Sequence, residues 1–199
     1  MIYPSKDNIT KVLFFKIETA PISLQPTEAW NEKDWLQEAG FSPEFGQIIC
    51  FSFGYFKNNK SEYIFKKDKS EKEILVEAFE LINKTYDKGN ILCNNNLKWT
   101  LPFINRKAIK YGLQIPYPFR TFLFKPWEMD FLIDLSTFMG FNGIAPPLSE
   151  VYASYGLKPI DFDNVPKMFF VEEKESLNNL FLIQIKLIMA LYKKIILCV

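Results

Sequence analysis

Short apolar runs separated by turn-forming residues dominate the first third of the chain. Three of them, at residues 12–19, 45–56 and 61–67, are rich in aromatic and β-branched side chains, which is typical of buried strands. The turn-like sequence KNNK at residues 57–60 separates the second run from the third. The pattern therefore predicts three antiparallel strands that form a meander.

Helical spacing replaces this pattern after residue 70. Ser70 and Glu73 have the spacing of a capping box, and the apolar residues that follow recur every three or four positions, which predicts a helix that ends near Lys84. A further strand is expected at 90–95. Because a strand, a helix and a strand follow one another, we expect a right-handed crossover to a parallel neighbour.

The next elements are marked by proline and glycine. Thr100 is an N-cap candidate for a helix at 101–111, with Pro102 in the first turn and Gly112 at the end. The stretch 116–147 is rich in proline and phenylalanine, and its pattern indicates only a last strand at about 131–135. A short helix is expected at 148–155.

The C-terminal segment, residues 176–199, is apolar on almost every side. Its length would allow a membrane-spanning helix, but Gln184, Lys186, Lys193 and Lys194 interrupt it. The alternative is a long helix buried against a sheet, with its end covering a partner or a second copy of the chain. We expect the buried helix and no membrane contact.

These elements fit one α/β domain over residues 1–199, with a mixed central sheet flanked by helices. The composition is that of a folded protein, with 48% hydrophobic and 17% aromatic residues. The net charge is +1, so only a local basic patch could attract nucleic acid.

Cysteine and histidine usage narrows the chemistry. The three cysteines, Cys50, Cys93 and Cys198, are widely spaced, which argues against a disulfide framework and a thiolate metal site. Absence of histidine excludes Ser-His-Asp and Cys-His catalysis. The first residues lack the features of a signal peptide, so we expect a cytoplasmic protein.

Lys16 and Glu18 interrupt the first apolar run. Side chains two positions apart on a strand point to the same face, so this strand carries both charges on one side. An exposed pair on an edge strand would explain them without any function.

Several stretches resemble the predicted 3′-5′ exonucleases related to the exonuclease domain of family B DNA polymerases, which belong to the DEDD group with a ribonuclease H-like fold. The stretches are VLFFKIETAP, FGQIICFSFGYF, ILCNNNLKWTLPFINRKAIKYGL and KPWEM. The resemblance implies a ribonuclease H-like mixed sheet, with a three-strand antiparallel meander plus parallel strands.

In that family, carboxylates bind two metal ions that activate the attacking water and stabilise the leaving oxygen. The first family motif, D-I-E-T, is here K-I-E-T, from Lys16 to Thr19. Thr100 stands where the second motif has its aspartate. The least forced alignment of the third motif, Y-C-x-x-D, places Gln184 at the final acid, and the motif's tyrosine is absent.

The resemblance therefore implies a degenerate site in which Glu18 is vestigial and Lys16, Thr100 and Gln184 stand at the positions of lost acids. We expect the Lys16 ammonium to pair with Glu18 in place of a metal, because an unpaired buried charge is costly. No cofactor is expected. If the chain is an active exonuclease with a rearranged site, Mg²⁺ or Mn²⁺ would be needed, with Asp134 the foremost rescuing acid among others such as Glu128, Asp130 and Glu150.

Binding without cleavage is the function that this degenerate site favours, with single-stranded DNA or RNA as the partner. The candidate contacts are Thr19, Asn95, Trp99, Phe103, Arg106 and Lys107. A lysine-rich run between Lys57 and Lys72 could add charge, although a solvated surface would explain that run equally well. A protein–protein interaction module that uses the apolar C-terminal helix is the third alternative.

Overall fold

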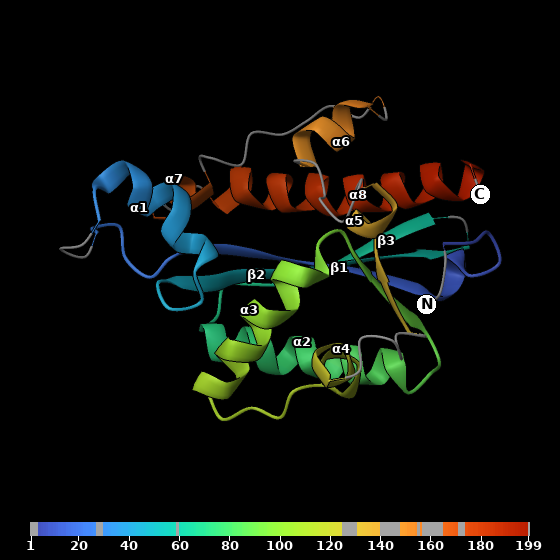
Figure 1. Cartoon of the computed structure of the whole chain (residues 1–199), viewed down its shortest axis with the longest axis horizontal. Coiled ribbons are helices and arrows are strands. Elements are labelled where there is room, and N and C mark those ends of the chain that lie inside the picture. Colours follow the sequence, from blue (N-terminus) through green and yellow to red (C-terminus); the bar gives the residue numbers. More distant parts are fainter. Residues whose placement is uncertain are drawn as a thin grey trace.

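A computed structural model describes residues 4–26, 30–58, 60–124, 131–139, 148–154, 156, 165–170 and 174–198. These residues form an α/β structure around one five-stranded mixed sheet (Figure 1). The strands are β1 (Val12–Pro21), β2 (Gly46–Lys57), β3 (Lys60–Lys66), β4 (Ile91–Asn94) and β5 (Leu132–Asp134).

The sheet has the order β3-β2-β1-β4-β5. Strands β1, β2 and β3 pair antiparallel, whereas β4 is parallel to β1 and β5 is parallel to β4. The predicted meander and the predicted parallel crossover are therefore confirmed. Since β1 is central, its residues are covered on both faces.

Helices α2 (Glu71–Tyr86), α3 (Leu97–Lys110) and α4 (Tyr117–Phe124) cover one face of the sheet, and the long helix α8 (Lys174–Cys198) covers the other (Figure 1). The remaining helical elements are η1 (Ile9–Lys11), α1 (Glu32–Glu38), η2 (Ala39–Phe41), α5 (Ser136–Met139), α6 (Leu148–Ser154) and α7 (Val165–Phe170).

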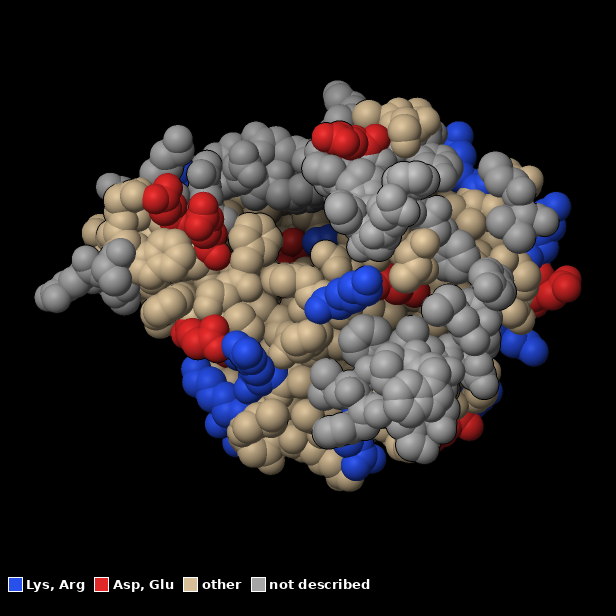
Figure 2. Space-filling view, in the orientation of Figure 1, with Lys and Arg blue, Asp and Glu red and all other residues tan. Residues whose placement is uncertain are grey.

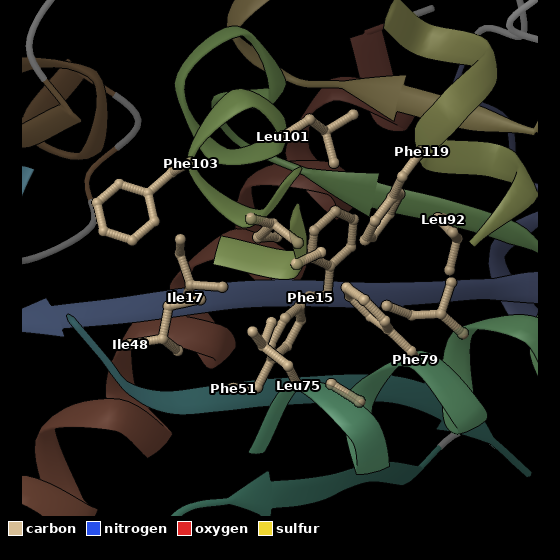
Figure 3. Close-up of a cluster of buried hydrophobic side chains, with 14 of the residues drawn as sticks. Phe15, Ile17, Ile48, Phe51, Leu75, Phe79, Leu92, Leu101, Phe103 and Phe119 are labelled. Atoms are coloured by element: carbon tan, nitrogen blue, oxygen red, sulfur yellow. The ribbon is translucent and has the colours of Figure 1, made fainter. Parts of the chain in front are cut away.

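The two faces of β1 belong to different hydrophobic clusters. Leu13, Phe15 and Ile17 face α2 and α3, where they pack with Phe103 and Phe119 (Figure 3). The alternate residues, Val12 and Phe14, face α8. Because strand side chains alternate, Lys16 and Glu18 continue the second series and lie on the α8 face.

Helix α8 packs closely against β2. A Cβ added to Gly54 of β2 would lie 2.5 Å from Sδ of Met189 and 3.0 Å from Cγ1 of Ile185, so glycine lets this helix approach the sheet. The sheet-facing residues of α8 are buried, while Ile183 and Leu197 remain exposed. Among the described residues, no helix has the length and apolar character needed to cross a membrane.

The predicted helix boundaries differ from the structure mainly at α3. The capping box of Ser70 and Glu73 is present, and α2 ends at Tyr86 rather than near Lys84. Helix α3 begins four residues earlier than predicted, because the Asn96 side chain caps it in place of Thr100. Pro102 is thus in the second turn.

Candidate functional site

A pocket of about 380 Å³ opens where β1 extends past the end of β4. Its wall comes from β1, the α1–η2 segment, the start of α3 and α7. In Figure 2 this face is hollowed, with acidic and basic side chains inside the hollow. The lining residues are Lys16, Ile17, Glu18, Thr19, Leu36, Gly40, Phe41, Asn95, Asn96, Trp99, Thr100, Val165 and Pro166.

The charged pair of β1 lies on the pocket wall. The Lys16 ammonium Nζ donates to Oε1 of Glu18 at 2.7 Å, and the two side chains are 19% and 8% exposed. The predicted pairing across the strand face is confirmed. Burial raises the pKa of the Glu18 carboxyl above its ordinary value of 4.5, and the charge and hydrogen bond of Lys16 partly offset this.

The backbone of β1 is irregular at this point. Its register with β2 shifts between Glu18 and Thr19, where Glu18 pairs with Cys50 but Thr19 pairs with Ile48. Such a bulge changes the direction of side chains next to it. Both Glu18 and Thr19 line the pocket, although they are sequence neighbours on one strand.

A network of asparagines fixes the β4–α3 loop beside this strand. The Asn94 side-chain amide donates to the Phe15 carbonyl at 2.8 Å, and its Oδ1 accepts from the Asn96 backbone N–H at 2.7 Å. The Thr100 hydroxyl contacts the same Oδ1 at 3.4 Å, so Thr100 stabilises the loop and does not cap α3. Both Asn95 and Asn96 line the pocket.

Two aromatic residues form another wall. The rings of Trp99 and Phe41 meet edge to face with centroids 5.8 Å apart, and the Trp99 indole N–H donates to the Phe41 carbonyl at 3.2 Å. Phe41 is 62% exposed. Trp99 was predicted from the sequence, whereas Phe41, Leu36 and Asn96 were missed. No local pattern of the sequence indicated these residues.

A hydroxyl and a thiol of β2 lie beside Lys16 and Glu18 on the α8 face of the sheet. On β2, Ser52 pairs with Lys16 of β1, and Cys50 pairs with Glu18. The Cys50 thiol contacts the Ser52 hydroxyl at 3.4 Å. Burial raises the pKa of the Cys50 thiol to about 12, so it is uncharged at neutral pH. Cys50 is therefore a buried, protonated thiol at neutral pH.

Gln184, which the sequence resemblance aligned with the acid of the third motif, is 1% exposed on α8. Neither of its amide atoms has a hydrogen-bond partner among the described residues, and it does not line the pocket. The Tyr152 hydroxyl, on α6, is likewise buried without a partner there. Burial and the Glu18 charge raise the pKa of Tyr152, which keeps the phenol protonated.

Asp134 lies at the end of β5 but belongs to the opposite face from Glu18. Asp134 lies two positions after Leu132 on β5, so the two side chains share one face of the sheet. Leu132 packs in the cluster under α2 and α3. Its oxygens accept from the Leu97 backbone N–H at 3.0 Å and from the Ser136 backbone N–H and hydroxyl at 3.0 and 2.8 Å. Asp134 therefore orders the start of α3, and the structure does not bring it together with Glu18. Burial raises the pKa of Asp134, and these hydrogen bonds oppose the shift.

Among the described residues that line the pocket, Glu18 is the single carboxylate available to a pair of catalytic metal ions. Two metals need several carboxylate oxygens that converge on one point, but the Glu18 carboxylate is paired with an ammonium group. In the part of the chain that the structure describes, no group of three or more acids, cysteines or histidines could hold a metal ion. The candidate acids Glu128 and Asp130 lie outside the described residues.

Two of the residues predicted to contact nucleic acid, Phe103 and Lys107, are buried in this structure. Phe103 belongs to the core (Figure 3), and Lys107 is 1% exposed. The Lys107 ammonium donates to the Gly46 carbonyl oxygen and lies 3.5 Å from a carboxylate oxygen of Glu71. Arg106 is exposed, and its guanidinium pairs with Glu44 at 2.5 Å. The sequence had not shown which side of α3 faces the core.

The lysine-rich run after β2 is partly neutralised by its own neighbours. Lys66 lies 3.1 Å from a Glu77 carboxylate oxygen, and Lys69 pairs with the other oxygen of the same group. Both lysines lower the pKa of Glu77 by hydrogen bonding. Lys67 lies 3.6 Å from Asp68. The run is therefore a weaker site for phosphates than its sequence suggests.

Fold and site together define an α/β protein whose pocket combines one ion pair, two asparagines, threonine hydroxyls and an aromatic wall. No family model matches the chain, and no curated protein has significant sequence similarity to it.

Proposed function

We propose that this chain is a pseudo-nuclease with a ribonuclease H-like fold, which binds single-stranded nucleic acid in the Lys16–Glu18 pocket without cleaving it. The observation that carries the proposal is the 2.7 Å ion pair inside the pocket. In the resemblance to DEDD exonucleases, a metal-binding aspartate would stand at Lys16. A fixed ammonium there repels a divalent cation and already satisfies the one remaining acid.

No described residue in or beside the pocket replaces the missing chemistry. The Thr100 hydroxyl, which lines the pocket, is used by Asn94. The Tyr152 phenol and the Cys50 thiol do not line the pocket, and both are protonated at neutral pH. A phosphodiester needs strong charge stabilisation on its attacking and leaving oxygens before it hydrolyses at a useful rate. We infer that the site binds and does not catalyse.

The lining favours an unstacked base over a bare phosphate. Lys16 and Glu18 sum to zero charge, while Trp99 and the exposed ring of Phe41 offer flat apolar surface. The side-chain amides of Asn95 and Asn96 can hydrogen bond to base edges. Stacking on aromatic side chains accepts any base, so we expect binding of single strands with little sequence preference.

Fluorescence anisotropy with labelled single-stranded DNA and RNA decamers, in the presence of a chelator, tests this function. Because a stacked base contributes about 1 to 3 kcal/mol, Trp99→Ala should weaken binding about tenfold. Phe41→Ala is a second test that touches less of the core, since this ring is mostly exposed. Tyr117→Ala removes a half-exposed aromatic from α4, outside the pocket, and should leave the affinity unchanged.

Equal losses in all three variants, or no binding of either decamer at millimolar protein concentration, would contradict strand binding at this pocket. Circular dichroism of each variant shows whether the fold is retained.

A further inference from the structure

A second pocket, of about 260 Å³, lies near the opposite end of β1 from the first. It is enclosed by the start of β1, by β2 and β3, and by the second half of α2. Its lining residues are Thr10, Lys11, Val12, Leu13, Tyr55, Ile64, Leu81, Lys84, Thr85, Lys88 and Asn90. Leu13 of this pocket and Thr19 of the first lie six positions apart on β1, or roughly 20 Å at about 3.3 Å per residue.

Three exposed lysines, Lys11, Lys84 and Lys88, surround this pocket. None of them forms an ion pair with any residue that the structure describes, in contrast to Lys66 and Lys69. Like charges around a small volume repel one another, and a bound anion would relieve this repulsion.

The end of α2 explains only part of this arrangement. Lys84 is in the last turn, where a cation interacts favourably with the helix dipole. Lys11 belongs to η1 at the start of β1, and Lys88 follows the end of α2. Cations from separate elements therefore converge on one pocket.

The interior of the pocket is apolar. Leu13 is part of the core, and the half-buried Tyr55, Ile64 and Leu81 pack against the same cluster. The Tyr55 hydroxyl donates to the Glu62 carboxylate, so its ring is held in one orientation. This surface suits a flat ring, while the surrounding ammonium groups suit a negative charge.

Groups that can form hydrogen bonds also line this pocket, together with the apolar side chains and the lysines. The Thr85 hydroxyl donates to the Leu81 carbonyl at 2.7 Å and is therefore occupied. The Thr10 hydroxyl and the Asn90 amide also line the pocket and make no side-chain hydrogen bond to any described residue. They remain open to a polar group of a ligand.

We propose that this second pocket binds a nucleotide, with the ring against Tyr55 and the phosphate among Lys11, Lys84 and Lys88. The volume is close to the lower limit of about 300 Å³ for small-molecule sites, so it accommodates one small ligand. The nucleotide is either a free mononucleotide or the phosphorylated end of a strand, since both present the same chemistry. The site does not depend on the pseudo-nuclease pocket.

Titration calorimetry with adenosine 5′-monophosphate, adenosine and inorganic phosphate tests the proposal. Adenosine 5′-monophosphate should bind at least tenfold more tightly than either of the others, and its affinity should fall as salt rises. The double variant Lys11→Ala/Lys84→Ala should reduce this affinity at least tenfold. Lys72→Ala/Lys110→Ala removes two exposed lysines elsewhere on α2 and α3, gives the same net charge, and should change it less than twofold.

Nitrogen-15 chemical shifts locate the bound nucleotide. Shifts at Leu13, Tyr55 and Lys88 support the proposal, and a 5′-phosphorylated decamer compared with an unphosphorylated one distinguishes a strand end from a free nucleotide as the source. Trp99→Ala should leave these shifts unchanged, which separates this site from the first pocket. No binding at 5 mM nucleotide, equal loss in both double variants, or shifts confined to the first pocket would overturn the proposal.

Discussion

At the scale of single residues, the ion pair of Lys16 and Glu18 determines what the pocket can hold. An ammonium and a carboxylate at 2.7 Å, in a partly closed pocket, stabilise each other and leave no net charge for a divalent cation. The alternation of β1 predicted this pair from the sequence. It could not predict the burial of Lys107, because a lysine that pairs with Glu71 thirty-six positions earlier has no local signature.

The coupling within this pair is measurable by a double-mutant cycle. Lys16→Met leaves the Glu18 carboxylate buried and unpaired, and should lower the free energy of unfolding by about 2 kcal/mol. In the cycle with Glu18→Gln, urea denaturation at pH 7 should give an interaction energy of about 1 to 2 kcal/mol. An interaction energy near zero would mean that the pair is an ordinary solvated contact.

The pH dependence of stability tests the environment of Glu18. Its pKa in the folded state is raised above 4.5, so the folded protein takes up this proton at a higher pH than the unfolded chain. The Glu18 contribution to stability therefore increases as the pH falls through the folded pKa towards 4.5. We expect Glu18→Gln to abolish this component in urea denaturation between pH 8 and pH 4.5.

Glu44→Gln is a control for which the pH dependence of stability should have the opposite sign. The pKa of this exposed carboxyl is lowered, first by the Ser42 hydrogen bond, so its contribution is lost as the pH falls. If Glu18→Gln and Glu44→Gln changed the profile in the same direction, the assigned environment of Glu18 would be wrong.

At the scale of elements, local signals predicted those parts that local interactions determine. The capping box defined the start of α2, and the alternation of apolar residues defined β1 and β2. The start of helix α3 was misplaced because Pro102 resembles a first-turn proline, whereas Asn96 caps the helix and Pro102 lies in its second turn. Helices α1, α4 and α7 are short and depend on contacts with distant residues, so their sequences alone did not indicate them.

Two glycines of β2 should differ in their tolerance of a side chain. A Cβ on Gly46 would meet the Gly40 carbonyl oxygen and lie 2.8 Å from the Ser42 carbonyl oxygen, which are backbone atoms that cannot rotate away. At Gly54 the nearest atom belongs to the flexible Met189 side chain. Gly46→Ala should therefore cost about 3 kcal/mol in urea denaturation, and Gly54→Ala about 1 kcal/mol. A larger cost at Gly54 would contradict the difference between these rigid backbone neighbours of Gly46 and the flexible side chain beside Gly54.

At the scale of the whole molecule, the sheet separates two layers of helices (Figure 1). The two pockets lie near opposite ends of β1. The mixed-sheet α/β class followed from the order of predicted elements. The pocket lining did not, because Phe41 and Val165 come from segments far from β1 in sequence. Tertiary packing of η2 and α7 against β1 brings them together, and no local sequence pattern encodes that packing.

The most direct test of the central claim is metal-dependent trimming of end-labelled single strands. Purified protein and Glu18→Ala are incubated with DNA and with RNA, each with Mg²⁺, with Mn²⁺ and with chelator. We predict that neither protein shortens either strand under any of these conditions. Metal-dependent removal of 3′ nucleotides that Glu18→Ala abolishes would show that the Lys16–Glu18 pocket is an active nuclease site, and would contradict its assignment as a pseudo-nuclease.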